Sequence, residues 1–236
     1  MNYQLPRHPW SVTPKEAIAI QQGLRELVKL SSLKSAPRWI AGVDLSYEIG
    51  GKELWAVIVV LDPADLSIKG WSGVQDEMRF PYVPGLLSFR EIPALIKAWD
   101  QMPIKPDLIM ADGHGIAHPR RVGIATHLGL ITDTPTIGCG KNILVGQHAD
   151  LGLEKGSSQP LIHQGETVGY ALRTRNKVKP MYISPGHLID LGEARKYAMA
   201  AVGKYRMPET TRQAHLLVNQ LRRGEIKPGV QGLDSN

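Results

Sequence analysis

The sequence predicts an α/β fold in which helices flank a mixed β-sheet. Strand-like runs joined by short, turn-rich links come early in the chain, and helical segments alternate with short apolar strands after them. The 236 residues include 42% hydrophobic and 21% charged residues and show no internal repeat, so one core can form without disulfides. We therefore expect a single domain over residues 1–236.

The first predicted element is an amphipathic helix that begins after Thr13. Thr13 and Glu16 have the spacing of a capping box, and Pro14 stands at the first helical position. Apolar residues then recur on one helical face, at Ala17, Ile20, Leu24, Leu27 and Val28. This spacing predicts a helix that ends near Leu30.

A meander of three antiparallel strands is predicted next. The links between its strands, at 48–52 and 62–65, are short and rich in turn-forming residues. The predicted strands cover residues 39–47, 54–61 and 66–80.

The rest of the chain alternates between helix and strand at spacings typical of parallel strands with crossover helices. The predicted order is helix 87–101, strand 108–111, helix 119–130 and strand 136–138. Two strands and two helices follow, over 167–174, 180–184, 191–202 and 208–223. Residues 153–159 form the loosest stretch, and the tail after about residue 224 has no assigned role.

This order, β-β-β-α-β-α-β, resembles the ribonuclease H-like architecture, which is an analogy from the order of elements. In that architecture the first and fourth strands lie side by side at the centre of a mixed sheet. We therefore expect strand 39–47 to lie beside strand 108–111.

The net charge of +6 is concentrated towards the end of the chain. Residues 171–236 hold 12 Lys and Arg against 5 Asp and Glu, whereas residues 1–170 hold 16 against 17. A basic segment beside a near-neutral body is typical of proteins that bind polyanions such as nucleic acids. Charge alone is equally compatible with an ordinary solvated surface.

Composition also limits where the protein works. The first residues, 1–7, lack the features of a secretory signal, and no apolar run approaches the roughly 18 residues of a membrane span. The single cysteine, Cys139, excludes an internal disulfide and favours a reducing compartment. We expect a cytoplasmic monomer that does not contact membranes, with Cys139 in a packing role.

Three acidic residues stand at positions where an ordinary core needs apolar ones. Asp44 interrupts an apolar strand, Asp112 ends the next predicted parallel strand, and Glu91 lies on the core-facing stripe of its helix. Because strands 39–47 and 108–111 are expected to be adjacent, we expect the three acids to converge on one point. Carboxylates held together repel one another unless a divalent cation neutralises them, and Mg²⁺ prefers oxygen ligands. Each has an alternative interpretation: a buried ion pair for Asp44, a turn for Asp112, and a capping box with Ser88 for Glu91.

The segments around these acids resemble the endonuclease V family of metal-dependent nucleases, which nick nucleic acid beside deaminated bases. The resemblance spans roughly residues 10–224, and Gly140 departs from it where the family often has alanine. The matching segments are 41–46, 80–91, 112–121, 135–141, 184–187 and 208–215.

The resemblance implies a catalytic site. Asp44 and Asp112 would bind Mg²⁺, which Mn²⁺ can replace, while Glu91 and His215 would complete the site through water or a second ion. From the residues alone, His215 flanks an apolar helical stripe and is better explained by packing.

The resemblance also implies how the substrate is bound. The segment Pro81 to Pro84 is a stiff loop that presents Tyr82, which would act as a wedge in the base stack. The alternative is a turn with Tyr82 packed on the sheet. The expelled base would lie in a pocket around Gly85, Leu87 and Gly113. Strand contacts would come from Gly113, Gly115, His118, Arg120 and Lys141.

The implied activity is Mg²⁺-dependent nicking of a strand that contains a deaminated base, chiefly hypoxanthine, which arises from adenine and is the base of deoxyinosine. The cut would fall at the second phosphodiester bond 3′ to the lesion and would initiate DNA repair. One alternative is an endoribonuclease that acts on inosine in RNA. Another is a binding protein without catalysis, although such a protein has no reason to keep buried like charges.

Overall fold

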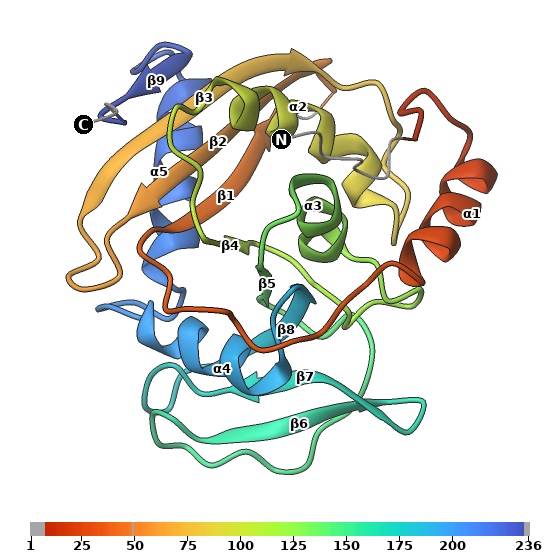
Figure 1. Cartoon of the computed structure of the whole chain (residues 1–236), viewed down its shortest axis with the longest axis vertical. Helices are drawn as coiled ribbons and strands as arrows, with labels where there is room; N and C mark the ends of the chain where they lie inside the picture. The colour runs from red at the N-terminus through yellow and green to blue at the C-terminus, as the bar shows by residue number, and fades with distance from the viewer. Residues whose placement is uncertain (1–7, 49, 234–236) are drawn as a thin grey trace.

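A computed structural model describes residues 8–48 and 50–233, and its centre is one nine-stranded mixed sheet (Figure 1). The strand order is β6-β7-β8-β5-β4-β1-β2-β3-β9. The strands are β1 (Ile40–Tyr47), β2 (Glu53–Leu61), β3 (Ile68–Glu77), β4 (Leu108–Ala111), β5 (Thr136–Gly140), β6 (Ser158–His163), β7 (Glu166–Leu172), β8 (Met181–His187) and β9 (Gly229–Gln231). The helices are α1 (Pro14–Arg25), α2 (Leu87–Gln101), α3 (Ile124–Thr132), α4 (Leu191–Ala200) and α5 (Glu209–Arg222). Residues 1–7, which bear on the expected absence of an export signal, lie outside the described residues.

The centre of the sheet has the predicted topology. Strand β1 pairs antiparallel with β2 and parallel with β4, and β4 pairs parallel with β5. The predicted antiparallel meander β1-β2-β3 is therefore confirmed, and so is the adjacency of the first and fourth strands. In this register Val43 pairs with Ala111. Asp44 and Asp112 are the next residues, so they stand side by side where the pairing of β1 with β4 ends.

Helices cover both faces of the sheet because its strands are apolar on both sides. One face packs against α2 and α3 through Ile92, Leu95 and Leu128. The other packs against α4 and α5 through Ala198 and Val218. This three-layer arrangement leaves the carboxyl ends of β1 and β4 between α2 on one side and α5 on the other (Figure 1).

A very close contact fixes α5 on β1. A Cβ atom built on Gly42 would lie 2.0 Å from the backbone oxygen of Thr210, in the first turn of α5. Only glycine allows this separation, because any larger residue would push the helix outwards. The contact brings the following turns of α5 over the carboxyl-terminal half of β1.

Two helix boundaries differ from the predicted ones. Helix α1 ends at Arg25 rather than near Leu30, and Lys29 bonds instead with the end of β8 and the residue after it: its N–H donates to His187 Nδ1 at 3.2 Å and its carbonyl accepts from the Leu188 N–H at 2.7 Å. Helix α3 begins at Ile124 rather than at residue 119. Gly123 packs against the backbone at His114, where a Cβ atom would lie 2.2 Å from the carbonyl oxygen, and this contact holds the chain in a loop.

Two strands, β6 and β9, were not predicted from the sequence. They are the two edge strands of the sheet. Strand β6 starts within the stretch assigned as loosest, and β9 lies in the tail that had no assigned role. Strand β9 pairs antiparallel with Trp71–Gly73 of β3. No helix among residues 8–48 and 50–233 is both long and apolar enough to cross a bilayer.

Candidate active site

Asp44 and Asp112 lie together at the centre of the sheet: Asp44 is in the middle of β1, just beyond its last residue paired with β4, and Asp112 follows the end of β4. The Leu45 backbone N–H donates to Asp44 Oδ1 at 2.9 Å. Burial raises the pKa of the Asp44 carboxyl, and the negative charge of Asp112 raises it further. A bond from His215 opposes both effects.

Glu91 approaches the same place from α2. Its side chain is buried on the core-facing side of the helix, as predicted. Burial, followed by repulsion from Asp44, raises the pKa of Glu91 to about 8. The capping-box interpretation is wrong, because α2 begins at Leu87 without a side-chain cap and Ser88 Oγ instead bonds with His127 Nδ1 at 2.9 Å.

The pKa of Glu91 has a consequence for stability. Because the folded state holds this proton up to about pH 8 and the unfolded state releases it near the ordinary value of 4.5, the contribution of Glu91 to stability falls as pH rises across that window. We expect Glu91→Gln to raise the midpoint of thermal unfolding in chelator at about pH 8, with little difference at about pH 4.5. Thermal melts across this range measure the effect, with the exposed Glu77→Gln as the control. Equal shifts at both pH values would contradict it.

The three carboxylates influence one another but do not form one compact ligand cluster. No group of three or more His, Cys, Asp or Glu side chains has metal-site geometry within the described part of the chain. Each aspartate has a partner of its own: the Lys141 ammonium bonds Asp112, and His215 Nδ1 donates to Asp44 Oδ2 at 2.8 Å. The expectation that the three acids converge on one point is therefore met only in part.

The donor set nevertheless fits a divalent cation. All three groups are carboxylates, which are the ligands that Mg²⁺ and Mn²⁺ accept. The raised pKa values of Asp44 and Glu91 show that each carries an uncompensated electrostatic cost, which a nearby cation would remove.

His215 joins this group from α5. Its side chain is 52% exposed, which the packing interpretation does not explain. The Asn219 amide donates to the other ring nitrogen, Nε2, at 3.3 Å. The bond to Asp44 and the close packing of α5 against Gly42 together account for the position of the ring.

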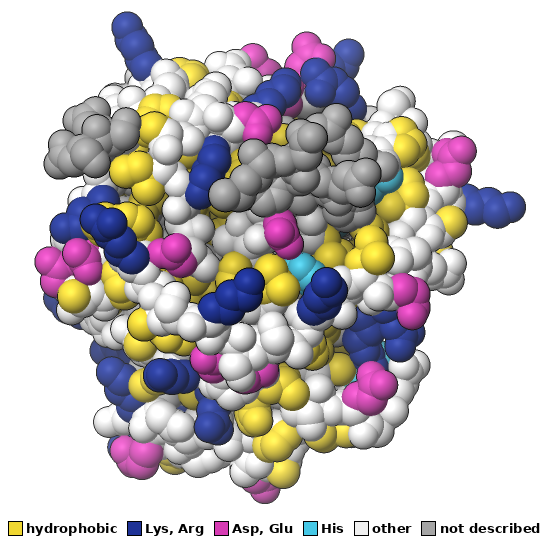
Figure 2. Space-filling view, in the orientation of Figure 1, with side chains coloured by type: hydrophobic (Ala, Val, Ile, Leu, Met, Phe, Trp, Pro, Cys, Tyr) yellow, Lys and Arg dark blue, Asp and Glu magenta, His cyan; other side chains and the backbone are white. Residues whose placement is uncertain are grey.

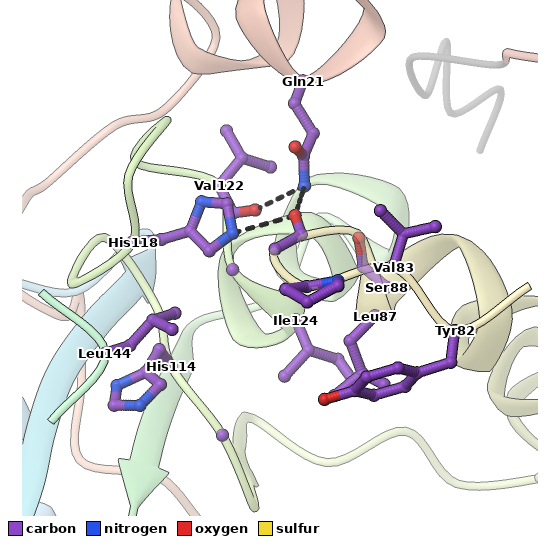
Figure 3. Close-up of a pocket in the computed structure, with 14 residues that line it drawn as sticks. Gln21, Tyr82, Val83, Leu87, Ser88, His114, His118, Val122, Ile124 and Leu144 are labelled. Carbon is purple, nitrogen blue, oxygen red and sulfur yellow. Dashed lines mark hydrogen bonds between the residues drawn. The ribbon is translucent and has the colours of Figure 1, made fainter. Parts of the chain in front are cut away.

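A pocket of about 210 Å³ is lined by Gly113, which follows Asp112, and by Leu87 and Ser88, which lie one turn before Glu91 on α2. Figure 3 shows this pocket. Tyr82 stands at this pocket with 66% of its surface exposed, so the alternative of a tyrosine packed on the sheet is wrong. The loop behind it is anchored by Phe80 and Phe89, whose ring centroids are 5.6 Å apart. The pocket is lined by Gln21, Tyr82, Val83, Pro84, Gly85, Leu87, Ser88, Gly113, His114, His118, Val122, Gly123, Ile124 and Leu144.

The residues predicted to bind substrate occupy different places. Gly85, Leu87, Gly113 and His118 line the pocket with Tyr82, whereas Pro81 is exposed beside it. The side chain of Lys141 reaches Asp112 rather than the pocket. These positions are compatible with the predicted roles, which remain predictions.

Three of the predicted strand contacts have a role inside the protein. Gly115 is buried, and a Cβ atom there would lie 2.0 Å from Pro185 O, so the glycine is needed for packing against β8. His118 is buried with both ring nitrogens bonded, to Gly85 O and to the Arg120 N–H. Arg120 also donates to Gly85 O, at 2.7 Å. His118 and Arg120 therefore support the pocket loop through the Gly85 carbonyl.

Gln21, Val122 and Ile124 line the pocket but were not predicted from the sequence. Gln21 could have been recognised, because it is a polar residue on the apolar stripe of α1 between Ala17 and Leu24. Cys139 is buried in β5, where burial raises the pKa of its thiol, in agreement with the predicted packing role.

The basic residues do not form one continuous surface on the face that Figure 2 shows, where Lys and Arg side chains are interspersed with Asp and Glu. The three charged residues of the segment 175–179 are all exposed: Arg175, Lys177 and Lys179. The charge excess is therefore available to a polyanion, although it is spread over loops and over the helices α4 and α5.

Comparisons with known proteins agree on one family. The profile of the family described as Endonuclease V matches residues 22–216. An endonuclease V of Myxococcus xanthus is 49% identical over 217 residues, which cover 92% of this chain and 92% of that protein. The crystal structure of an endonuclease V from Streptomyces avermitilis has a TM-score of 0.87 and 43% identity, and the match covers 92% of this chain and 96% of the other.

A more distant structure shares the fold. It is the Ciona intestinalis endonuclease V in complex with DNA that contains an inosine followed by a ribo-adenosine, with a TM-score of 0.78 and 24% identity over 90% of this chain and 98% of the other. The predicted ribonuclease H-like fold is confirmed by these structures. The chain therefore belongs to the endonuclease V family of nucleases.

Proposed function

We propose that this protein is a Mg²⁺-dependent endonuclease that recognises deaminated bases, chiefly hypoxanthine, in DNA. It nicks the damaged strand at the second phosphodiester bond 3′ to the lesion and so initiates repair. The observation that carries the proposal is the position of Asp44, Glu91 and Asp112 beside a pocket with an exposed tyrosine. We further propose that residues 1–236 act as one domain and as a monomer in the cytoplasm.

The acidic residues would hold the metal. Asp44 and Asp112 are placed to bind Mg²⁺, or Mn²⁺ in its place, and Glu91 would assist through water or a second ion. When bound, such an ion activates the attacking water and stabilises the charge on the leaving oxygen. Lys141 bonds Asp112 in this structure and is therefore well placed to contact a phosphate group that lies over the site.

His215 orients one of these carboxylates. Its Nδ1–H donates to Asp44 Oδ2. In this tautomer Nε2 carries no proton and accepts from the Asn219 amide, and about half of the side chain is exposed. The ring can therefore hold Asp44 in place and exchange a proton at Nε2 with a group above the site.

Base recognition would occur in the pocket next to the acids. Tyr82 would fill the space that an everted base leaves in the stack, while the base enters the pocket at Gly85, Leu87 and Gly113. The Ciona complex contains inosine-containing DNA, which supports a nucleic-acid substrate with a deaminated base.

A denaturing gel tests the proposal. Matched labelled strands carry one deoxyinosine, one inosine or neither, and each is incubated with Mg²⁺ and then with chelator. We expect a single nick beside deoxyinosine that requires the metal. Preferred cutting of the inosine-containing RNA would instead identify the endoribonuclease alternative. Binding without metal-dependent cutting would identify a non-catalytic binding protein.

We expect His215→Ala to slow the chemical step more than it weakens binding. The variant loses the bond that fixes Asp44, but the pocket and Tyr82 are untouched. The loss of one positioned proton-transfer group costs about 10²- to 10⁴-fold. Single-turnover rates at saturating enzyme measure the effect, with the neighbouring exposed Leu216→Ala as the control. A wild-type rate would return His215 to the packing interpretation.

A further inference from the structure

Gln21 is a buried polar side chain on the apolar face of α1. It is 1% exposed and lies between the buried residues Ala17 and Leu24. Burying an amide in such a stripe is unfavourable unless its polar atoms are bonded. Both ends of the Gln21 amide are bonded, and none of the bonds lies within α1.

The amide nitrogen bridges two walls of the pocket (Figure 3). Gln21 Nε2 donates to Gly85 O at 3.1 Å, in the loop that carries Tyr82. It also donates to Val122 O at 3.0 Å, in the segment that leads to Ile124. The amide oxygen accepts from Arg120 Nε at 2.5 Å. One side chain from the N-terminal helix therefore sets the distance between two walls that are 37 residues apart in the sequence.

Two further donors reach the same Gly85 carbonyl. His118 Nδ1 accepts from the Arg120 backbone N–H at 3.2 Å, so its proton is on Nε2, which donates to Gly85 O at 3.0 Å. Burial lowers the pKa of His118 to about 4, which keeps the ring in this neutral form. Arg120 Nη2 donates to the same oxygen at 2.7 Å.

These bonds fix the backbone where it is otherwise least constrained. Gly85 has a φ of +77°, in the region that glycine enters most readily. Three donors on one carbonyl oxygen exceed its two lone pairs, so this oxygen is fully used within the protein. The orientation of the peptide group after Gly85 is thereby set before any ligand arrives, which is the condition for selective binding.

We propose that Gln21 is a positioning residue for base selection, which fixes the orientation of the Gly85 and Val122 backbones so that the pocket distinguishes a 6-oxo purine from a 6-amino purine by hydrogen bonding rather than by size. The inference rests on the proposed function of the pocket. Gln21 lines the pocket, but all of its amide bonds are made within the protein, so it acts on the base through the backbone that it holds and makes the N-terminal helix α1 part of the recognition apparatus.

The experiment compares Gln21→Met with Gln22→Met. Methionine keeps the length and volume of glutamine but cannot make the three bonds, and Gln22 is an exposed neighbour on the same helix. Dissociation constants are measured on strands that are identical except for one deoxyinosine or deoxyadenosine, with Ca²⁺ in place of Mg²⁺. Single-turnover cleavage with Mg²⁺ at saturating enzyme is measured in parallel.

We expect Gln21→Met to reduce the preference for the deoxyinosine strand about tenfold, since all three bonds of the amide are lost. Affinity for the undamaged strand and the cleavage rate at saturation stay close to wild type, and Gln22→Met changes neither quantity. A variant that merely loosens the fold would lower the midpoint of thermal unfolding without changing the preference. Gln21→Asn, which keeps the amide but is too short for both walls, shows the same loss of preference if Gln21→Met does not fold.

Three results would overturn the inference. The first is a wild-type preference in the folded Gln21 variants. The second is an equal loss of affinity on both strands, which would reveal general loosening of the surface. The third is a wild-type protein that does not prefer the deoxyinosine strand, in which case the proposed function fails as well. Only the third removes the proposed function, so the two failures can be told apart.

Discussion

Asp112→Asn is expected to abolish cleavage while leaving lesion binding measurable. Asparagine keeps the shape of the side chain but removes the charge that would hold the metal and that bonds Lys141. A metal ion contributes several kcal/mol to the stabilisation of charge in such a reaction, and a loss of about 4 kcal/mol slows it roughly a thousandfold. The pocket is built from other residues and keeps its shape.

Two measurements check this result. Single-turnover cleavage of a deoxyinosine strand reports on the chemical step, and a gel shift in Ca²⁺ reports on binding. Asp150→Asn is the matched control, because Asp150 is an exposed aspartate away from the acids. Nicking at the wild-type rate by Asp112→Asn would show that this carboxylate does not serve the metal.

Tyr82→Ala is expected to weaken lesion binding without impairing the acids. The ring is 66% exposed on a loop with two prolines, so its removal creates no cavity in the core. Stacking of a base on an aromatic ring contributes about 1–3 kcal/mol, which corresponds to a roughly five- to 150-fold loss of affinity. A wedge matters most in a duplex, where a base must be unstacked, and least on a single strand.

The comparison therefore uses both kinds of substrate at one salt concentration, with Ca²⁺ in the binding assay. Tyr205→Ala controls for the loss of an exposed tyrosine elsewhere on the surface. An equal loss on single and double strands would show that Tyr82 stacks on a base without opening the duplex. No loss on either substrate would remove Tyr82 from recognition.

The sequence predicted the centre of the fold because its strands are unambiguous. The apolar runs of β1, β2 and β4 admit few other interpretations, and their order predicts which of them are neighbours. The positions of Asp44 and Asp112 followed directly, since Asp44 interrupts one of these runs and Asp112 ends the next parallel one.

The edge strands could not be predicted in the same way. Strand β6 carries Ser, Gln and Pro and is only partly buried, and β9 has three residues. Such segments become strands because a partner, β7 or β3, offers unpaired backbone groups. Their own side chains contain little of that information.

Side-chain partners across the fold were also beyond the sequence. Nothing in the spacing of His118, Arg120 and Gln21 shows that all three reach the Gly85 carbonyl. Likewise, a glycine such as Gly115 marks a close approach of some kind, but not whether the approaching group is a phosphate or the backbone of β8.

The contact between Gly42 and Thr210 makes the active site sensitive to changes on its far side. Gly42 stands two residues before Asp44 on β1, and Thr210 stands five residues before His215 on α5. The contact between Gly42 and Thr210 therefore fixes the position of Asp44 relative to His215. A methyl group added at position 42 would tilt the helix and lengthen the bond between His215 and Asp44 without touching either residue. Mutations in this part of the core are thus limited by the alignment of Asp44 with His215, which the proposed activity needs, as well as by folding. Changes that compensate for a larger residue at position 42 should be sought in the first turn of α5.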